Sequence, residues 1–285
     1  MNKLTIALQK SGRLHEDSVK LLKECGIEIS NGLSKLKIEA ENFPLEVFFF
    51  RDDDIPQYVE EGIADIGIVG ENVLMEKKGV VIVIEKLGFG KCRLSIAVPK
   101  QADYTGVNWL NGKRIATSYK NILQEYLNSQ QIQAEIHEIS GSVEIAPSIG
   151  LADAICDLVS SGSTLLANGL KEAEIIFKSE AVLIAHRNLK DEKQNILNKL
   201  LFRITSVKKS KYNKYILLNA PNEKLNMICS ILPGMKSPTI LPLAEPGWSS
   251  VHSVVHEDKF WEIIEQLKAE GAQGILVIPI EKMIL

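Results

Sequence analysis

The stretch of the chain best suited to chemistry is Cys156–Leu166, with the sequence CDLVSSGSTLL. A short apolar run carries Asp157 and ends in the turn Ser160–Gly162, and a helix-like run follows from Thr164. Unpaired N–H groups in the first turn of a helix, together with serine and threonine hydroxyls, are good donors for a phosphate group. Gly162 allows the backbone to approach such a ligand closely. The stretch therefore predicts an anion-binding turn between a strand and a helix.

Asp157 narrows the kind of anion that this turn would bind. A carboxylate repels a phosphate group unless it binds sugar hydroxyls or acts through Mg²⁺. A phosphate, ribose hydroxyls and a metal ion together indicate a sugar phosphate. The same residues are equally compatible with an ordinary capped helix after a strand, with Asp157 solvated, and the turn alone does not separate these interpretations.

Basic residues and glycines near other predicted strand ends form a second set of candidates. Arg13 follows a strand and Gly12 at the head of a helix, and Arg51 follows the apolar run LEVFFF. A guanidinium group at such a place can bind a phosphate through two parallel hydrogen bonds. Each candidate also has a purely structural role as its alternative. The further candidates are Lys10, Gly70, Glu71, Cys92 and Arg93.

Short apolar runs that alternate with amphipathic runs must position these residues. Helices are predicted for LHEDSVKLLKECG, which Gly26 would end, and for DIPQYVEEG, with Pro56 in its first turn and Gly62 after its last. Strands separated by helices predict a parallel α/β construction. The predicted strands are Leu4–Leu8, Leu45–Phe50, Ala64–Val69, Val80–Leu87, Leu94–Val98, Arg114–Thr117, Ala134–Ile139 and Ala154–Val159.

Two segments of the chain share an order of features. In GIADIGIVGEN (62–72) and GLADAICDLVSSG (150–162), a helix-ending glycine precedes an Ala-Asp pair, a buried strand and a turn with glycine. Two similar α/β lobes facing each other across a cleft would show this similarity, and such a cleft is a common place for a small ligand.

The pattern changes after about Lys208. The order of predicted elements becomes strand, helix, strand, strand, helix and strand, which is typical of a ferredoxin-like module. The basic stretch VKKSKYNK (207–214) is predicted to be a linker before this module, and a solvated turn at the same boundary is equally compatible with it.

The composition excludes several classes of protein. Of the 285 residues, 45% are apolar and 24% are charged, and the net charge of −3 gives no general attraction to nucleic acid or anionic membranes. The four cysteines lack CxxC spacing, no run approaches the ~20 apolar residues of a membrane span, and the start of the sequence lacks a signal peptide pattern. We therefore expect a cytoplasmic protein with no nucleic-acid partner and no membrane partner.

Residues Glu144–Leu165, EIAPSIGLADAICDLVSSGSTL, resemble the signature of the ATP phosphoribosyltransferases, the first enzymes of histidine biosynthesis. The similarity continues in the family's order through LQKSGRL, RDDDIP, ADIGIVGEN, CRLSIAVP, LPGMKSPTILPLA and ILVIPIEKM. The C-terminal module resembles that of the long-form enzymes, which carry their own regulatory domain. The short form needs a synthetase-like partner subunit instead.

The resemblance implies an α/β fold with two periplasmic-binding-protein-like lobes around a cleft and a C-terminal ferredoxin-like regulatory domain. The implied division places residues 1–92 and 183–207 in lobe I, residues 93–182 in lobe II, and residues 208–285 in the regulatory domain. The implied reaction is attack of N1 of the adenine of ATP on C1′ of phosphoribosyl pyrophosphate (PRPP), with Mg²⁺ present and pyrophosphate released. No side chain is identified as a general base, and adenine N1 is itself the attacking atom.

The resemblance also assigns roles to the candidate residues. Asp157 would bind the ribose hydroxyls of PRPP, and Mg²⁺ would be held mainly by the substrate near Asp157, without a dedicated protein cage. The 5′-phosphate would be bound by Ser160, Ser161, Gly162, Ser163 and Thr164. ATP would be bound by Lys10, Gly12, Arg13, Arg51, Gly70, Glu71, Cys92 and Arg93.

The C-terminal module would bind histidine as a feedback inhibitor, with Asn219, Thr239 and Ser253 as candidate contacts. The family further implies a homo-oligomer that exchanges between dimer and hexamer. The alternative outside the enzymes is a two-lobed solute-binding protein or sensor, because the same architecture serves such receptors. A start without an export signal, and a turn suited to phosphate plus ribose, favour the enzyme.

Overall fold

The computed structural model describes residues 3–29, 36–232 and 234–284. The chain divides into two compact units, Met1–Lys23 with Ile27–Leu197 and Glu24–Gly26 with Asn198–Leu285. Helix α6 (Asp191–Lys211) runs through this boundary and through the predicted boundary at residue 208. The prediction of a linker at VKKSKYNK is wrong, because this stretch ends α6 and begins the next strand. The exact domain limits stay a prediction.

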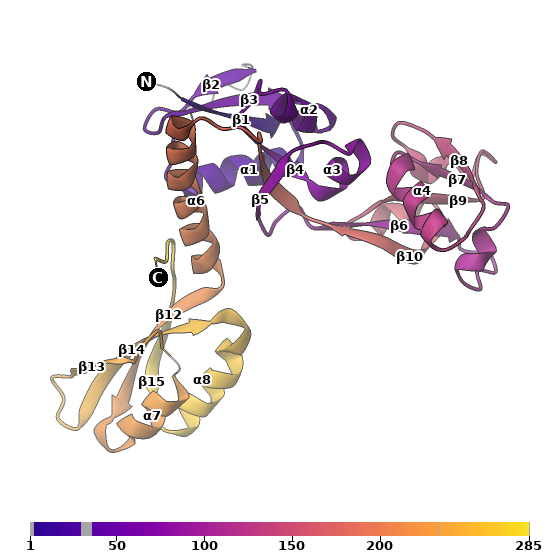
Figure 1. Ribbon diagram of the computed structural model, residues 1–285. Helices are drawn as coiled ribbons and strands as arrows, with labels where there is room; N and C mark the ends of the chain where they lie inside the picture. The colour runs from indigo at the N-terminus through magenta and orange to yellow at the C-terminus, as the bar shows by residue number, and fades with distance from the viewer. Residues whose placement is uncertain (1–2, 30–35, 233, 285) are drawn as a thin grey trace. The chain divides into compact units, whose positions relative to one another are not determined.

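The first unit contains two sheets, and the first sheet has the order β2-β3-β1-β4-β11-β5 within the described residues (Figure 1). The neighbours β3, β1 and β4 are parallel, as predicted, whereas β2, β11 and β5 run antiparallel to their neighbours. The strands are β1 (Leu4–Gln9), β2 (Lys37–Glu39), β3 (Leu45–Phe50), β4 (Ile66–Gly70), β5 (Ile82–Lys86) and β11 (Ala181–Ala185).

Helices of the first lobe begin and end where the sequence predicts. Helix α1 (Arg13–Glu24) buries Leu21 and Leu22, and Gly26 follows it with a φ of 70° that favours glycine. The other helical elements of this lobe are η1 (Asp52–Asp54), α2 (Ile55–Glu60) and α3 (Glu71–Lys77).

The second sheet has the order β10-β6-β9-β7-β8 in the part of the chain that the structure describes. Strands β9, β7 and β8 are parallel, and β6 and β10 add antiparallel strands at one side. The strands are β6 (Cys92–Pro99), β7 (Arg114–Thr117), β8 (Glu135–Glu138), β9 (Ala154–Val159) and β10 (Leu170–Ser179). The helical elements are η2 (Val107–Leu110), α4 (Lys120–Ser129), η3 (Val143–Ile145) and α5 (Ser163–Ala167).

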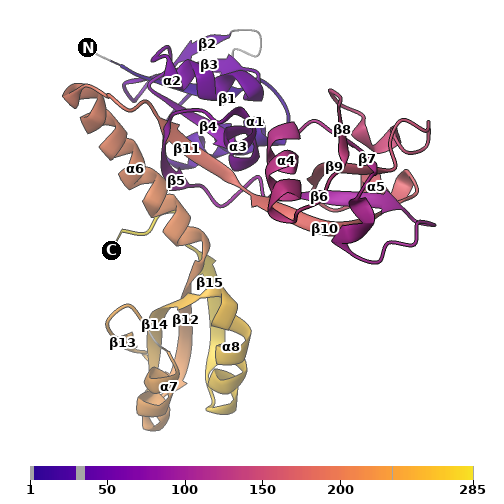
Figure 2. The ribbon, with the colours of Figure 1, turned by 45° about the vertical axis from the view of Figure 1, so that its right-hand side comes forward.

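The chain crosses between the two sheets twice, and the two crossings pair with each other. Leu87 N donates to Ala181 O, and Ala181 N donates to Phe89 O, both at 2.9 Å. Gly88 N donates to the Glu180 carboxylate at 3.0 Å. Strands β6 and β10 continue this pairing into the second sheet, where they lie side by side (Figure 2). The crossings therefore form one hydrogen-bonded ribbon that joins the two lobes.

Helix α3 of the first lobe also contacts helix α4 of the second. The Glu76 carboxylate accepts hydrogen bonds from the backbone N–H groups of Asn121 at 2.9 Å and Ile122 at 3.1 Å, in the first turn of α4. Asn72 Nδ2 donates to the hydroxyl of Tyr119 at 3.1 Å. Glu76 thus caps a helix of the other lobe and satisfies N–H groups that have no partner within that helix.

The C-terminal module has the predicted strand-helix-strand-strand-helix-strand order and is ferredoxin-like. Its four antiparallel strands, counted among the described residues, have the order β13-β14-β12-β15, and two helices cover one face (Figure 2). The strands are β12 (Asn213–Pro221), β13 (Thr239–Pro242), β14 (Trp248–His256) and β15 (Gln273–Pro279). The helical elements are η4 (Asn222–Lys224), α7 (Leu225–Ile231), η5 (Glu257–Lys259) and α8 (Phe260–Ala269).

Within the described ranges, no helix combines the length and the apolar character needed to cross a bilayer.

The Glu76 cap predicts a measurable effect on stability. Glu76→Ala should lower the free energy of unfolding of the first unit by about 0.5–2 kcal/mol, because it removes a helix cap. Glu125→Ala is the matched control, since Glu125 pairs only at the surface with Lys78 at 2.8 Å. Urea denaturation, with amide hydrogen exchange at Asn121 and Ile122, checks this expectation. Equal effects of the two substitutions would contradict it.

Candidate active site

Strand β9 places Asp157 at the edge of a fully buried segment. Ile155 and Cys156 have no exposed surface, and Asp157 lies beside Ser95 of β6 in the antiparallel register. The strand ends at Val159, and Gly162 adopts a φ of 82° immediately before the short helix α5. The strand, turn and helix therefore follow one another as the sequence predicts.

The turn after β9 presents hydroxyl groups to solvent. Ser161, Ser163 and Thr164 are exposed. The hydroxyls of Ser161 and Ser163 lie 3.0 Å apart and share a hydrogen bond. The Ser161 hydroxyl also accepts a long hydrogen bond from the backbone N–H of Ser163, at 3.5 Å. Exposed hydroxyls with such partners can exchange these bonds for bonds to a ligand at small cost.

The Asp157 carboxylate is held in an unfavourable environment. Burial raises the pKa of Asp157 above its usual range, and the nearby Glu144 carboxylate raises it further. One hydrogen bond from the backbone N–H of Leu158, at 2.8 Å, offsets part of this effect. A carboxylate in this state gains stability from a ligand that supplies hydroxyl donors or a cation.

A cavity of about 280 Å³ joins these groups. It is lined by Asp157, Glu144, the turn residues 158–165 and Arg13, which is the first residue of α1 in the other lobe. The cavity thus holds two carboxylates, a guanidinium and the turn hydroxyls. Glu144 was not among the predicted site residues, although the signature stretch EIAPSIGLADAICD begins with it.

The first lobe contributes the ends of three neighbouring parallel strands. Gln9 at the end of β1 lies beside Phe50 at the end of β3, so the following residues Lys10 and Arg51 emerge at one edge of the sheet, together with Gly70 from β4. Ligands of α/β proteins bind at such an edge. A side chain at Gly70 would clash with Asn72 Oδ1, which explains the glycine. The structure also places Gly12, with a φ of 90°, at this edge beside Arg13.

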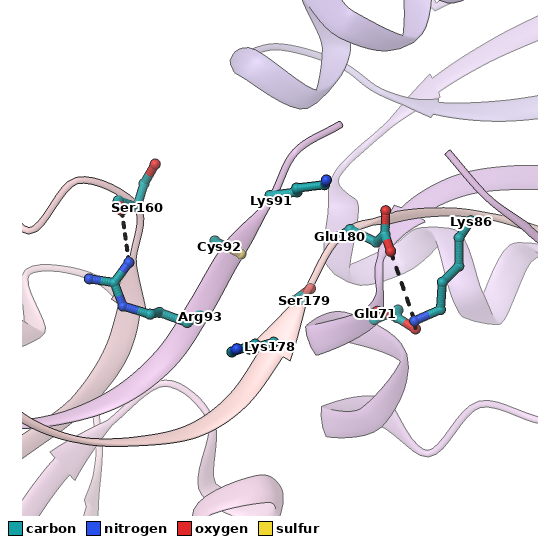
Figure 3. A pocket seen from close by; sticks show the side chains of 9 residues that line it. All are labelled: Glu71, Lys86, Lys91, Cys92, Arg93, Ser160, Lys178, Ser179 and Glu180. Atoms are coloured by element: carbon teal, nitrogen blue, oxygen red, sulfur yellow. Dashed lines mark hydrogen bonds and ion pairs between the residues drawn. The ribbon is translucent and has the colours of Figure 1, made fainter. Parts of the chain in front are cut away.

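The remaining predicted ATP contacts, Glu71, Cys92 and Arg93, lie together around a second cavity of about 480 Å³ (Figure 3). The eight predicted ATP residues therefore do not line one cavity, since Arg13 lines the first. Burial raises the pKa of the Cys92 thiol, which disfavours the reactive thiolate.

Arg93 is already engaged by other protein groups. Its guanidinium donates to both carboxylate oxygens of Glu172, at 2.5 and 2.7 Å, and to the carbonyl oxygen of Ser160 at 3.0 Å. The hydrogen bonds from Arg93 hold the pKa of Glu172 below its usual range. Arg93 thus fixes the start of the serine turn, a role that its position in the sequence did not predict.

The predicted histidine contacts do not share one face of the C-terminal sheet. Thr239 pairs with His252 and Asn219 pairs with Ser250, which places both on the face opposite the helices. Ser253 is adjacent to His252 in β14 and lies on the covered face, where it is 5% exposed. Of the described residues, none forms a hydrogen bond with the Ser253 hydroxyl.

Among residues 3–29, 36–232 and 234–284, no group of three or more histidine, cysteine or acidic side chains forms a metal site. The paired carboxylates of Glu144 and Asp157 supply the oxygen ligands that Mg²⁺ prefers, and substrate oxygens would have to complete its coordination.

Comparison with known proteins matches residues 51–206 to the family described as ATP phosphoribosyltransferase. This chain belongs to the ATP phosphoribosyltransferase family. Residues 210–282 match the C-terminal domain described for the same family (HisG, C-terminal domain), so the chain has the long form. It is thus an enzyme of the first step of histidine biosynthesis.

Full-length relatives agree with this assignment. The ATP phosphoribosyltransferase of Cytophaga hutchinsonii is 62% identical over 281 residues, which cover 99% of this chain and 98% of that protein. The ATP phosphoribosyltransferase of Phocaeicola vulgatus is 58% identical over 282 residues, which cover 99% of this chain and all of that protein.

Solved structures support the predicted two-lobed fold. The ATP phosphoribosyl transferase (HisG:HisZ) complex from Thermotoga maritima has a TM-score of 0.62 at 30% identity, covering 71% of this chain and 96% of that chain. A putative periplasmic sulfonate-binding protein from Methylobacillus flagellatus has a TM-score of 0.51 at 16% identity, covering 74% of this chain and 68% of that chain. The second likeness concerns the fold alone, and it confirms lobes of the periplasmic-binding-protein type.

The raised pKa of Asp157 predicts opposite effects on stability and activity. A carboxyl group whose folded pKa is raised stabilises the protein when protonated, and this stability is lost as the pH rises through the folded pKa. Asp157→Asn should therefore leave the Tm at pH 7 unchanged or higher, while kcat/KM for PRPP falls roughly 10- to 150-fold with the lost charged hydrogen bond.

The control is Asp103→Asn, which changes an exposed aspartate with no ion pair to a described residue. Thermal denaturation from pH 4 to pH 8 and kinetics at sub-saturating PRPP test the two effects. A lower Tm with unchanged PRPP kinetics would assign Asp157 a structural role.

Proposed function

We propose that this enzyme transfers the phosphoribosyl group of PRPP to N1 of the adenine of ATP, giving phosphoribosyl-ATP and pyrophosphate. The observation that carries this proposal is the cavity that joins the Glu144 carboxylate and the poorly solvated Asp157 carboxylate to the exposed hydroxyls of the serine turn. Carboxylates suit ribose hydroxyls, and turn hydroxyls with adjacent N–H groups suit a phosphate.

PRPP would lie on the second lobe. Asp157 and Glu144 would accept hydrogen bonds from the ribose hydroxyls, which supply the donors that these carboxylates lack. The 5′-phosphate would be bound along Ser160–Thr164. Arg93 would keep the start of this turn in place through its hydrogen bond to Ser160 O.

The reaction needs charge stabilisation and orientation more than proton transfer. Breaking the bond between C1′ and the pyrophosphate oxygen builds positive charge on the ribose and negative charge on the leaving group. The Asp157 and Glu144 carboxylates lie where they would stabilise the ribose charge. Mg²⁺, held by substrate oxygens near Asp157, would neutralise charge on the pyrophosphate. No general base is assigned, because adenine N1 carries its own lone pair.

ATP would approach from the first lobe. Lys10, Arg13 and Arg51 are exposed at the edge formed by the ends of β1 and β3, and Gly70 ends β4 at the same edge. The ribbon and the Glu76 cap hold this edge relative to the serine turn, and orientation of two bound substrates is a large source of rate enhancement.

Mixing the protein with ATP, PRPP and Mg²⁺ tests the proposed reaction. We expect pyrophosphate release together with a new nucleotide that contains a second ribose phosphate. Tight binding of either substrate without pyrophosphate release would favour a solute receptor and would contradict the proposal.

Replacing the exposed Arg13 should weaken substrate binding without changing the stability of the fold. Arg13→Ala should raise KM for ATP about 10-fold, because an exposed guanidinium that binds phosphate is lost, and the Tm should stay the same. Arg187→Ala, at another exposed arginine, is the control. Steady-state kinetics and thermal denaturation decide the outcome. A rise in KM for PRPP without a rise in KM for ATP would show that Arg13 binds PRPP in the cavity that it lines, and would contradict its role in ATP binding.

We further propose that the C-terminal module binds histidine and takes part in a homo-oligomer that exchanges between dimer and hexamer. The face of its sheet opposite the helices exposes Leu241, Leu276 and Ile278, at 50%, 55% and 43%. Asn219 and Thr239 lie on the same face. A second copy of the chain would cover these apolar side chains, and such burial favours association.

Ser253 provides a test of the histidine site in the full chain. A buried hydroxyl without a partner is unfavourable, so Ser253→Ala should leave the Tm unchanged or higher. If the hydroxyl binds histidine, the concentration of histidine for half inhibition should rise roughly 2- to 10-fold. If histidine still inhibits Ser253→Ala but no longer inhibits Thr239→Val, Ser253 does not bind histidine, and the histidine site lies on the face of the sheet opposite the helices.

A further inference from the structure

The cavity of about 480 Å³ at the ribbon is lined by four basic side chains. They come from β5, from the crossing before β6, from β6 and from β10 (Figure 3). These side chains are Lys86, Lys91, Arg93 and Lys178. Basic groups gathered in one cavity attract an anion most strongly where no carboxylate of the protein pairs with them.

Two of the four cations have carboxylate partners. Lys86 lies 2.8 Å from Glu71 and 3.9 Å from Glu180. Arg93 forms the two-pronged pair with Glu172. By contrast, Lys91 and Lys178 are exposed and form no ion pair with any residue that the structure describes.

Both lysines belong to the ribbon around this cavity. Lys178 lies directly opposite Arg93 in the pairing of β10 with β6, so their side chains share a face. Lys91 immediately precedes β6 and lines the same cavity. Lys91 and Lys178 are thus two separated ammonium groups beside one cavity (Figure 3).

Ser160 connects this cavity to the serine turn. It lines both the cavity of 480 Å³ and the cavity that contains Asp157. Arg93 binds the Ser160 carbonyl oxygen and so fixes the wall that the cavities share. An anion on Lys91 and Lys178 would therefore lie next to a substrate on the serine turn. An extended anion with several phosphates can reach two separated ammonium groups, which a single phosphate cannot do as well.

We propose that Lys91 and Lys178 bind a polyphosphate, either the triphosphate tail of ATP or the pyrophosphate that the reaction releases. This inference rests on the proposed function and adds two residues that recognise the phosphate chain rather than the adenosine. Lysine binds phosphate as a flexible point charge and tolerates either source.

Equilibrium binding to the full-length protein separates the sources. The dissociation constants of ATP, AMP and inorganic pyrophosphate are measured by calorimetry, each alone with Mg²⁺, for the wild type, Lys91→Gln and Lys178→Gln. Lys23→Gln is the matched control, since Lys23 is also exposed and has no ion pair to a described residue. Both test lysines are exposed, so we expect all variants to keep the wild-type Tm.

If the site holds the tail of ATP, each substitution at Lys91 or Lys178 weakens ATP binding roughly 5- to 10-fold and leaves AMP binding unchanged. If it holds the product, pyrophosphate binding weakens by this factor and ATP binding does not. Either result supports the proposal. The proposal is overturned if Lys91→Gln and Lys178→Gln change these dissociation constants no more than Lys23→Gln does. It is also overturned if they weaken the binding of ATP and of AMP equally. A wild-type protein that releases no pyrophosphate from ATP and PRPP refutes the proposed function instead, which a separate turnover assay shows.

Discussion

The antiparallel pairing of β6 with β10 is the interaction on which the rest of the structure depends. It carries the chain out of the first sheet and back, and the hydrogen bonds between Leu87, Phe89 and Ala181 lock the two crossings together. Strand β6 also pairs with β9, so the same strand sets the position of Asp157. A single ribbon therefore fixes both the join between the lobes and the place of the candidate active site.

Without substrate, the charged form of the Asp157 carboxylate is disfavoured by its surroundings, and the hydroxyls of a bound substrate would stabilise it. Burial raises the pKa of Asp157, and the nearby Glu144 carboxylate raises it further, while the backbone N–H of Leu158 stabilises the Asp157 carboxylate. Nearby, Arg93 donates to Glu172 and to the Ser160 carbonyl oxygen. The protein thus combines a hydrogen-bonded wall with a poorly solvated Asp157 carboxylate, an arrangement that favours a ligand with hydroxyls and cations.

Most strands of the two sheets and the C-terminal module were predictable because their apolar patterns are regular, but β2 and β11 were not predicted. Each predicted strand falls within or overlaps an observed one, and the serine turn follows β9 as expected. Strand β10 was missed because it alternates poorly, with charged residues and two register shifts along LKEAEIIFKS. The partners of Arg93 and Glu76 come from distant segments, so no local pattern indicates them. For the same reason the sequence could not show that Ser253 and Thr239 lie on opposite faces.

If PRPP binds on the serine turn with its ribose on Asp157, a crystal structure of the protein with PRPP and Mg²⁺ will show it. We expect the 5′-phosphate within hydrogen-bond distance of the N–H groups and hydroxyls of Ser161–Thr164, and the ribose hydroxyls on Asp157. PRPP bound at the first-lobe edge beside Arg51 and Gly70, with the serine turn free of ligand, would contradict it.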